Sequence, residues 1–364
     1  MKQLINKYFK IIDFYISGKF LGTFFYSIAL IISIATVFDI SENLDEFISK
    51  DIPTKDIIFS YYLNFIPYFA NLFSPLFTFI SVIYFTSKMA YNTEIIAILS
   101  SGMSYRRMMR PYLVSAAAIA AFSFILGNYV IPSANKERIN FRKKYILTNN
   151  RMAERNIHRQ IEPGVYIYMQ QFTNSNIGYM FTLEKFENQQ LVEKITADNI
   201  SWNDDSKRWV INNYWKRKFV GDQEFITRGY QIDTVLNMTP SDYKVELDEM
   251  EALTTKQLRS EIKSMKLRGV NYTEFAIERH KRISGPFSAF ILTIIGVSLA
   301  SRKIKGGLGF HLGLGILLSF SYILFMQVST VFAINGGTPP MLAVWIPNLL
   351  YAGIALFIYR WAAK

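Results

Sequence analysis

Long apolar runs, separated by shorter polar segments, form the main pattern along this chain. Six of these runs approach or exceed the roughly 20 residues that a helix needs to cross a bilayer. They cover about residues 20–40, 57–87, 112–131, 283–300, 308–333 and 341–359. A much longer polar stretch separates the third run from the fourth. The pattern therefore predicts a polytopic α-helical membrane protein with six transmembrane helices and one large insertion.

The insertion, residues 132–282, changes its period along its length. It begins as a helical continuation of the third span, and from about Ile161 it consists of runs rich in β-branched and aromatic residues. Turn sequences such as N-S-N, E-N-Q-Q and N-D-D-S-K separate these runs, as in antiparallel β-structure. Helical periodicity returns over 254–268. We therefore expect an all-β, jelly-roll-like domain with flanking helices, inserted between membrane parts at 1–131 and 283–364.

The polar segment between the second and third spans contains a short predicted helix over about 92–102. Asn92 and Thr93 are favourable N-cap residues, and Glu94 places a carboxylate at the positive end of the helix dipole. Gly102 suits the left-handed turn that ends a helix. A short helix between two membrane spans can receive a push from a soluble partner, although an ordinary surface loop has the same spacing.

Charge orients these elements in the membrane. The first nineteen residues mix lysines with apolar side chains at helical spacing, which predicts a basic amphipathic helix on the membrane surface, and no signal-peptide cleavage site follows. The chain has a net charge of +12. In the membrane part, the basic residues lie mainly in the short segments 1–19, 88–110, 302–305 and 360–364. The positive-inside rule then predicts that both termini are cytoplasmic and that the insertion lies outside. Charges within the insertion are mixed, so we expect no nucleic-acid partner.

Few residues offer chemistry. The chain has no cysteine, and His158, His280 and His311 are too far apart in sequence to show metal-ligand spacing. The glycine-rich segment 305–315 lacks the G-K-[ST] ending of a phosphate loop, so Gly309 and Gly313 are better interpreted as a small-residue pair for helix packing. We therefore expect no cofactor, no metal and no catalytic residues. If the protein uses ATP, a separate chain must hydrolyse it.

Four segments together resemble the LptF/LptG family of lipopolysaccharide-export permeases. They are N-T-E-I-I-A-I-L-S-S-G-M-S at 92–104, K-Y-F-K-I-I-D-F-Y-I-S-G-K-F-L-G-T-F at 7–24, V-I-P-S-A-N at 130–135 and E-R-H-K-R at 278–282. The order of spans and insertion agrees with that family as well. In the insertion the resemblance rests on the β-pattern alone.

The resemblance implies a permease in the bacterial inner membrane that is not itself an enzyme. Its expected partners are a homologous six-span permease, a dimer of cytoplasmic ABC ATPases, and a periplasmic bridge or single-span accessory protein. Lipopolysaccharide would leave the inner membrane through the paired permeases and pass along their periplasmic jelly rolls. The helix at 92–102 would be the coupling helix. Its expected ATPase-coupling residues are Glu94, Ile95, Ile98, Leu99 and Arg106.

Glycolipid contacts are harder to assign. Related permeases carry lysines around the outer end of the first span, where this chain has Asp39, Glu42, Asp45 and Glu46. The positive charge would then come from a partner subunit or a divalent cation, or the glycolipid would carry fewer phosphates. Candidates for an acyl-chain cavity, for which packing or lipid-facing roles are the alternative, are Phe24, Phe25, Phe38, Tyr322, Phe325 and Met326.

Two other functions are compatible with part of the pattern. The membrane subunit of a lipoprotein-release type of ABC system is one, but such subunits usually have four spans rather than six. A membrane-embedded enzyme acting on envelope lipids is the other, and it would require clustered His, Asp or Glu at one membrane face. The sequence alone does not distinguish an F-like from a G-like permease or identify the glycolipid.

Overall fold

The computed structural model describes residues 10–146, 154–173, 175–221, 223–240, 247–267, 271–302 and 307–362. The chain forms two compact units, and each is treated by itself below. The helical unit comprises Met1–Phe141, Glu251–Thr255 and Thr273–Lys364. The sheet unit comprises Arg142–Met250 and Lys256–Tyr272. The helical unit thus includes residues 132–141 and 273–282, which the sequence analysis assigned to the insertion.

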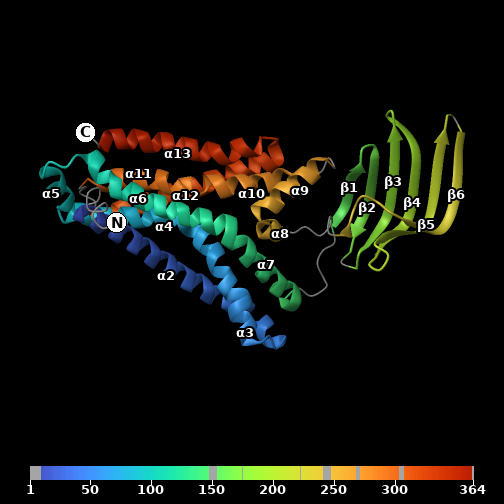
Figure 1. The fold of residues 1–364 in the computed structure, drawn as a ribbon, viewed down its shortest axis with the longest axis horizontal. Coiled ribbons are helices and arrows are strands. Elements are labelled where there is room, and N and C mark those ends of the chain that lie inside the picture. Colours follow the sequence, from blue (N-terminus) through green and yellow to red (C-terminus); the bar gives the residue numbers. More distant parts are fainter. Residues whose placement is uncertain are drawn as a thin grey trace. The chain divides into compact units, whose positions relative to one another are not determined.

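Long helices follow the apolar runs (Figure 1). The first part of the helical unit consists of α2 (Ile11–Ser49), α3 (Thr54–Asp56), the π-helical turn η1 (Ile57–Tyr62), α4 (Leu63–Tyr91), α5 (Glu94–Ser100), α6 (Tyr105–Ile125), η2 (Leu126–Val130) and α7 (Ile131–Phe141). The later part contains α8 (Leu247–Ala252), whose end belongs to this unit, followed by α10 (Thr273–Ser284), α11 (Phe287–Ala300), α12 (Gly307–Gly336) and α13 (Pro340–Ala362). A third π-helical turn, η3 (Arg142–Ile146), continues from α7.

Five helical segments of the described chain are long and apolar enough to cross a membrane. They are Ile11–Ser49, Thr54–Tyr91, Tyr105–Tyr145, Leu312–Gly336 and Pro340–Ala362. A sixth crossing requires α10 and α11 together, which are bent by 51° at the break between them. With 14 residues, α11 alone is about 21 Å long and is shorter than a hydrocarbon core of roughly 30 Å. The predicted fourth span, 283–300, is therefore the second half of a broken helix pair.

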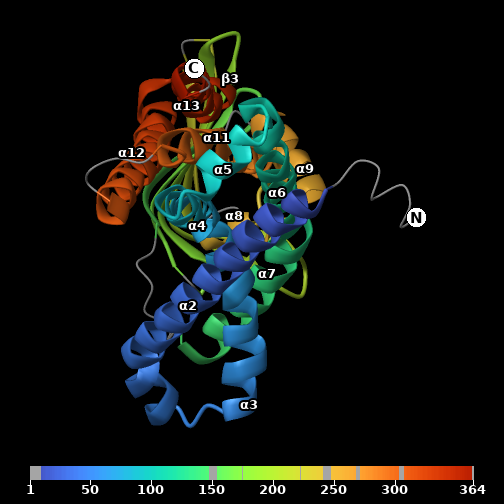
Figure 2. The same cartoon turned by 90° about the vertical axis from the view of Figure 1, so that its left-hand side faces the viewer.

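Helix α4 lies at the centre of the helical unit, where it packs against α2, α11 and α12. Figure 2 views this arrangement from the end at which α5 lies. Helix α2 begins and α13 ends at this same end (Figure 1). Large apolar side chains fill the centre of the unit, and Phe20, Phe79, Tyr112 and Leu292 are completely buried.

Two glycines allow close packing against α4. A Cβ atom added to Gly296 on α11 would overlap Val82 and Phe79, and one added to Gly315 on α12 would lie 2.6 Å from Ile83 Cδ1. Gly309 and Gly313, the pair that the sequence favoured for this role, have no atom within 4 Å of such a Cβ. Helix packing inside the chain therefore depends on Gly296 and Gly315 instead.

The helices extend beyond the predicted spans. Helix α2 continues to Ser49, so the acidic residues around the outer end of the first predicted span lie on its last turns. Pro132, the residue after the predicted third span, lies inside a continuous helical segment. The π-helical turn η2 immediately precedes it, and such a turn adjusts the backbone where proline removes a hydrogen bond.

The sheet unit contains six antiparallel strands in chain order. They are β1 (Glu154–Glu162), β2 (Val165–Phe172), β3 (Ile177–Glu187), β4 (Gln190–Asn203), β5 (Arg208–Val220) and β6 (Gln223–Thr234). Short turns connect neighbours, and Asn188 and Gln189 between β3 and β4 have φ values of 50° and 66°. Both central residues of a type I′ hairpin turn require such values. Helix α9 (Thr255–Leu267) agrees with the predicted helix at 254–268.

The jelly-roll topology predicted for this unit is wrong for the described strands. A jelly roll arranges eight strands as two Greek keys, whereas the six strands here form a single meander. One face of the sheet carries the apolar core, in which Met169, Phe181, Ile200 and Trp209 have no exposed surface. Strand β1 was not predicted, because β-structure was expected to begin only at about Ile161, after a helical stretch. Four of its side chains are charged, which obscures the apolar pattern of a strand.

Candidate functional site

The hinge between α4 and α6 is the first candidate site. It contains α5, as the sequence predicted, and Gly102 follows it with a φ of 86°, in the left-handed region that favours glycine. Thr93 occupies the N-cap position, but its φ is 63° and its side chain does not cap the helix. The first turn of α5 is instead joined to its surroundings through Glu94.

Glu94 is held by two side chains. The hydroxyl of Tyr15 on α2 donates to Glu94 Oε2 at 3.0 Å, and the amide of Asn92 donates to Oε1 at 3.2 Å. Tyr15 precedes Glu94 by 79 residues, so this contact joins the start of the first long helix to the hinge. The sequence identified Glu94 but gave no indication of Tyr15.

A buried ion pair lies close to the same contact. Arg107 on α6 binds both carboxylate oxygens of Asp13, with its Nη1 at 2.6 Å from Oδ1 and its Nη2 at 2.5 Å from Oδ2. Asp13 is 3% exposed and also accepts a hydrogen bond from the backbone N–H of Lys10 at 2.8 Å. A bidentate pair of this kind is directional and strong. It fixes the start of α2 against the start of α6.

The predicted coupling residues divide by exposure. Ile95 is 1% exposed and packs in the core of the helical unit, so its predicted role as an ATPase-coupling residue does not agree with its burial. Ile98 is half-buried against the same core, whereas Leu99 is exposed. Arg106 is exposed as well. Ile96, which was not among the predicted coupling residues, is 53% exposed and presents an apolar side chain to the outside.

The six residues predicted to line an acyl-chain cavity do not form one group. Phe24 is fully buried, whereas Phe25 and Phe38 on the same helix are exposed. On α12, Tyr322 is buried and donates to Asn348 Oδ1 at 2.9 Å, and Phe325 and Met326 are half-buried. Tyr322 and Met326 line a pocket. The phenylalanines of α2 do not belong to that pocket.

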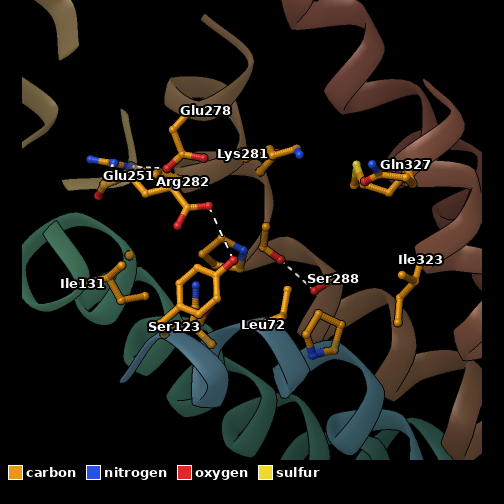
Figure 3. A pocket seen from close by; sticks show the side chains of 18 of the residues that line it. Leu72, Ser123, Ile131, Glu251, Glu278, Lys281, Arg282, Ser288, Ile323 and Gln327 are labelled. Atoms are coloured by element: carbon orange, nitrogen blue, oxygen red, sulfur yellow. Dashed lines mark hydrogen bonds and ion pairs between the residues drawn. The ribbon is translucent and has the colours of Figure 1, made fainter. Parts of the chain in front are cut away.

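This pocket is the second candidate site, and it was not predicted (Figure 3). Its volume is about 410 Å³, and residues of α4, α6, η2, α7, α8, α10, α11 and α12 line it. The contributing residues of α4, from Tyr68 to Pro75, lie about 25–35 Å along the helix from its end next to α5. This distance is comparable to the roughly 30 Å thickness of a hydrocarbon core, so the pocket lies far along α4 from the hinge that contains α5.

Four charged residues lie in the wall of the pocket: Glu251, Glu278, Lys281 and Arg282. Arg282 is 6% exposed, and its Nε donates to Glu278 Oε1 at 2.7 Å. The Arg282 Nη1 donates to the carbonyl of Leu253 at 2.7 Å. These partners compensate its desolvation. The carboxylate of Glu251 accepts from the Asn135 amide at 3.2 Å.

The break between α10 and α11 forms another part of the wall. Ser284, Gly285, Pro286 and Ser288 all line the pocket there. Ser288 Oγ donates to the Gly285 carbonyl at 2.6 Å, and the Asn348 amide donates to the Ser284 carbonyl at 3.2 Å. The bend interrupts the helical hydrogen bonds of these carbonyl groups, and the two side chains donate hydrogen bonds to them instead. The missed signals were the Glu278–Arg282 spacing of four residues and the S-G-P sequence that follows.

The acidic end of α2 is also ordered by hydrogen bonds. Asp39 accepts from Tyr61 at 3.2 Å and from Tyr62 at 3.0 Å. Within the part of the chain that the structure describes, no group of three or more His, Asp or Glu residues is arranged to hold a metal ion. The side chain of His311 lies outside the described residues.

The comparisons with known proteins decide the family. The family model described as "Lipopolysaccharide export system permease LptF/LptG" matches residues 14–361. The chain belongs to the LptF/LptG family. The resemblance found in the sequence is therefore confirmed, and the protein is a helical membrane protein that carries a β-domain.

Individual members of the LptF/LptG family are distant in sequence. The chain is 19% identical to the lipopolysaccharide export system permease protein LptG of Haemophilus influenzae, over 93% of this chain and 95% of that protein. It is 17% identical to the protein of the same name from Escherichia coli K12, over 82% of this chain and 84% of that protein. Both similarities cover most of each chain.

Proposed function

We propose that this chain is one permease subunit of an ATP-driven complex that moves lipopolysaccharide out of the inner membrane. The observation that carries this proposal is the family match, which covers nearly the whole chain from residue 14 to 361. In this proposal the subunit hydrolyses no ATP itself. A dimer of ABC ATPases binds at the cytoplasmic side, and a homologous six-span permease completes the membrane part.

The proposed orientation places α5 in the cytoplasm. Basic residues of the membrane part gather in the segments around α5, the N-terminal segment and the C-terminal end of the chain, which supports a cytoplasmic location by the positive-inside rule. The sheet unit then lies in the periplasm. There it passes lipopolysaccharide to a periplasmic bridge or to a single-span accessory protein.

The proposed coupling element is α5. Glu94 lies in its first turn with its carboxylate held between Tyr15 and Asn92, and it is the group we assign to a basic residue of the ATPase. Ile96 and Leu99 supply exposed apolar contacts, while Ile98 contributes its exposed part and Arg106 the charged rim. We leave Ile95 out of this surface because it is buried in the chain's own core.

Affinity purification of the tagged full-length chain from native membranes in a mild detergent tests the proposal. We expect mass spectrometry to identify a second permease, an ABC ATPase and bound lipopolysaccharide. Depletion of the chain in its own bacterium should leave lipopolysaccharide in the inner membrane. Purification without an ATPase, together with normal lipopolysaccharide export after depletion, would contradict the proposed function.

A further inference from the structure

A short stretch of the chain, the 251–255 segment, belongs to the helical unit although the chain on either side of it belongs to the sheet unit. Glu251 and Ala252 are the last residues of α8, and Thr255 is the first residue of α9. Leu253 and Thr254 between the two helices are not helical. The chain therefore returns to the helical unit here for five residues only.

Side chains at both ends of the 251–255 segment bind the helical unit. The carboxylate of Glu251 accepts hydrogen bonds from the Asn135 amide on α7 at 3.2 Å and from the Tyr68 hydroxyl on α4 at 3.5 Å. The Thr255 hydroxyl donates to Asn128 Oδ1 in η2 at 2.9 Å. These bonds join the segment to α4, η2 and α7, which lie far earlier in the chain.

Arg282, on the last turn of α10, binds the backbone of the same segment. Its Nη1 donates to the Leu253 carbonyl at 2.7 Å, and its Nη2 donates to the Glu251 carbonyl at 3.3 Å. The break between α10 and α11, where the helix pair bends by 51°, follows directly. Figure 3 shows Glu251 and Arg282 on the same side of the pocket, which both residues line. The segment is thus attached next to the break and forms part of the pocket wall.

The 251–255 segment is held mainly by polar contacts. Four of its residues are half-buried, and Thr254 is exposed. The apolar core of the helical unit, as far as the structure describes it, includes none of the five. A single hydrogen bond adds only modestly to stability in water, and elements with few buried apolar contacts open at a low free energy. The contacts therefore fix the segment in place and still allow its release.

Two of the groups that bind the segment also have partners on their own helices. Arg282 Nε donates to Glu278 Oε1 at 2.7 Å, and both residues belong to α10. The Asn128 amide donates to the Phe124 carbonyl, four residues earlier, at 3.0 Å. Neither bond involves the segment. Release of the segment would therefore not leave Arg282 as an unpaired buried charge, which is the main cost of breaking such contacts.

One buried group is incompletely paired while the segment is bound. Asn135 is completely buried, and its Oδ1 has no hydrogen-bond partner among the described residues. A buried carbonyl without a partner is unfavourable. The same amide contacts Glu251, so departure of Glu251 would open it to water. This unfavourable contribution opposes the bound arrangement and is absent once the segment is released.

We propose that the 251–255 segment is a latch that holds α10 to α4, η2 and α7 and opens in each transport cycle. In the closed arrangement, Glu251 completes one wall of the pocket and Arg282 is fixed beside the break. In the open arrangement, the pocket loses that wall and the bend between α10 and α11 can change. The inference rests on the proposed function, because it assigns one step of lipopolysaccharide export to this segment.

Cross-linking the latch in its closed arrangement tests the inference. The chain has no cysteine, so Asn128→Cys combined with Thr255→Cys places the only two thiols of this chain at the contact between η2 and the latch. The full complex with its partner permease and ATPase is reconstituted in proteoliposomes and treated with a short bifunctional thiol reagent that forms reducible disulfides. We expect the cross-linked complex to keep its ATPase but to extract lipopolysaccharide at no more than about a tenth of the untreated rate. Dithiothreitol should restore extraction.

Each single-cysteine variant, treated with the same reagent, is the matched control. Neither can form the cross-link, so both should extract lipid within about twofold of their untreated rates. A static anchor would tolerate the cross-link, because the cross-link preserves the closed contact. Extraction by the cross-linked complex at the untreated rate would therefore overturn the inference.

The rate of cross-linking is a second measurement, and it does not depend on extraction. A latch that opens during the cycle brings the two thiols together less often, so ATP and lipopolysaccharide should slow cross-linking about twofold or more. Equal rates at rest and during ATP hydrolysis would overturn the inference as well. If the first pair lowers the yield of folded complex, Glu251→Cys with Asn135→Cys joins the latch to α7 and replaces it in both measurements.

Failure of the inference is distinct from failure of the proposed function. If the wild-type complex contains its ATPase and extracts lipopolysaccharide, but the cross-linked complex does so equally fast, only the latch fails. If the wild-type complex contains no ATPase and extracts no lipopolysaccharide, the proposed function fails first.

Discussion

At the residue scale, the contacts of Asp13 show how a charge is retained at the start of the first long helix. The carboxylate is almost fully buried and is bound through both oxygens by Arg107. Removing one partner of a buried pair leaves the other charge without compensation. This pair therefore matters both for the stability of the helical unit and for the position of α2 relative to the hinge.

We predict that Asp13→Asn lowers the free energy of unfolding by about 2–3 kcal/mol, since it removes the charge-assisted hydrogen bonds to Arg107. Arg106→Gln is the matched control, because it changes the exposed neighbour of Arg107 and should alter stability by less than about 0.5 kcal/mol. Denaturant titration of the purified protein in detergent measures both. Equal stability of the two variants would show that the ion pair contributes nothing.

Tyr15 provides a second residue-scale prediction. Its hydroxyl donates to Glu94, so Tyr15→Phe removes one contact between α2 and α5 and leaves the carboxylate in place. We expect ATPase binding to persist while lipid-stimulated ATP hydrolysis falls about fivefold, the equivalent of roughly 1 kcal/mol. Tyr26→Phe alters an exposed tyrosine of the same helix and serves as control. Unchanged hydrolysis in Tyr15→Phe would mean that this contact does not transmit force.

At the element scale, close helix packing depends on the glycines that face α4. We predict that Gly296→Ala disturbs the α11–α4 contact, because the new Cβ would overlap the stiff side chain of Val82 as well as Phe79. The expected cost is about 1–3 kcal/mol. Gly313→Ala, where a Cβ meets nothing within 4 Å, should be tolerated. Thermal unfolding of both variants in detergent decides the matter, and equal melting temperatures would count against the packing argument.

Several elements could be predicted from the sequence because their signals are local. Helix α5 has a carboxylate at its start and Gly102 at its end, and α9 has a clear amphipathic period. The hairpin turns of the sheet were recognisable from their asparagine-rich sequences. Each of these features depends on residues that are close together in the sequence, so no tertiary information is required.

Other elements depend on contacts that a single sequence does not display. The polar half of the broken pair, α10, was assigned to the insertion because it is rich in charged residues, and most of the partners that bury Arg282 are distant in the sequence. Arg282 is satisfied partly by the carbonyl of Leu253, which lies 29 residues earlier. The meander was taken for a jelly roll because strand spacing alone does not specify which strands are neighbours. The pocket was missed for the same reason, since the residues that line it come from helices far apart in the sequence, from α4 to α12.

At the scale of the whole molecule, the proposed orientation makes a direct prediction. The chain has no cysteine, so single substitutions report accessibility without background labelling. We expect Ser100→Cys on α5 to react with a membrane-impermeant maleimide only after the inner membrane is opened. Lys218→Cys on β5 should react in intact spheroplasts. Labelling in the reverse pattern would contradict the assignment of α5 to the cytoplasm.

The same orientation connects the two candidate sites. ATP-driven force would enter at α5, where Glu94, Tyr15 and the Asp13–Arg107 pair join the hinge to α2 and α6. The pocket lined by the broken pair of α10 and α11 lies about 25–35 Å along α4 from the end next to α5. Helices α4 and α6 extend from one site to the other, so they are the elements that can carry movement between them.

ATP-dependent extraction of lipopolysaccharide from proteoliposomes tests the central claim most directly. The measurement compares the reconstituted wild-type complex with the Glu94→Ala complex, with equal amounts of folded permease confirmed by size-exclusion chromatography. We predict that the wild type releases lipid to an acceptor protein when ATP is added. The Glu94→Ala complex should bind less ATPase and release lipid at no more than about a tenth of that rate. Extraction by Glu94→Ala at the wild-type rate, with normal ATPase recovery, would contradict the account.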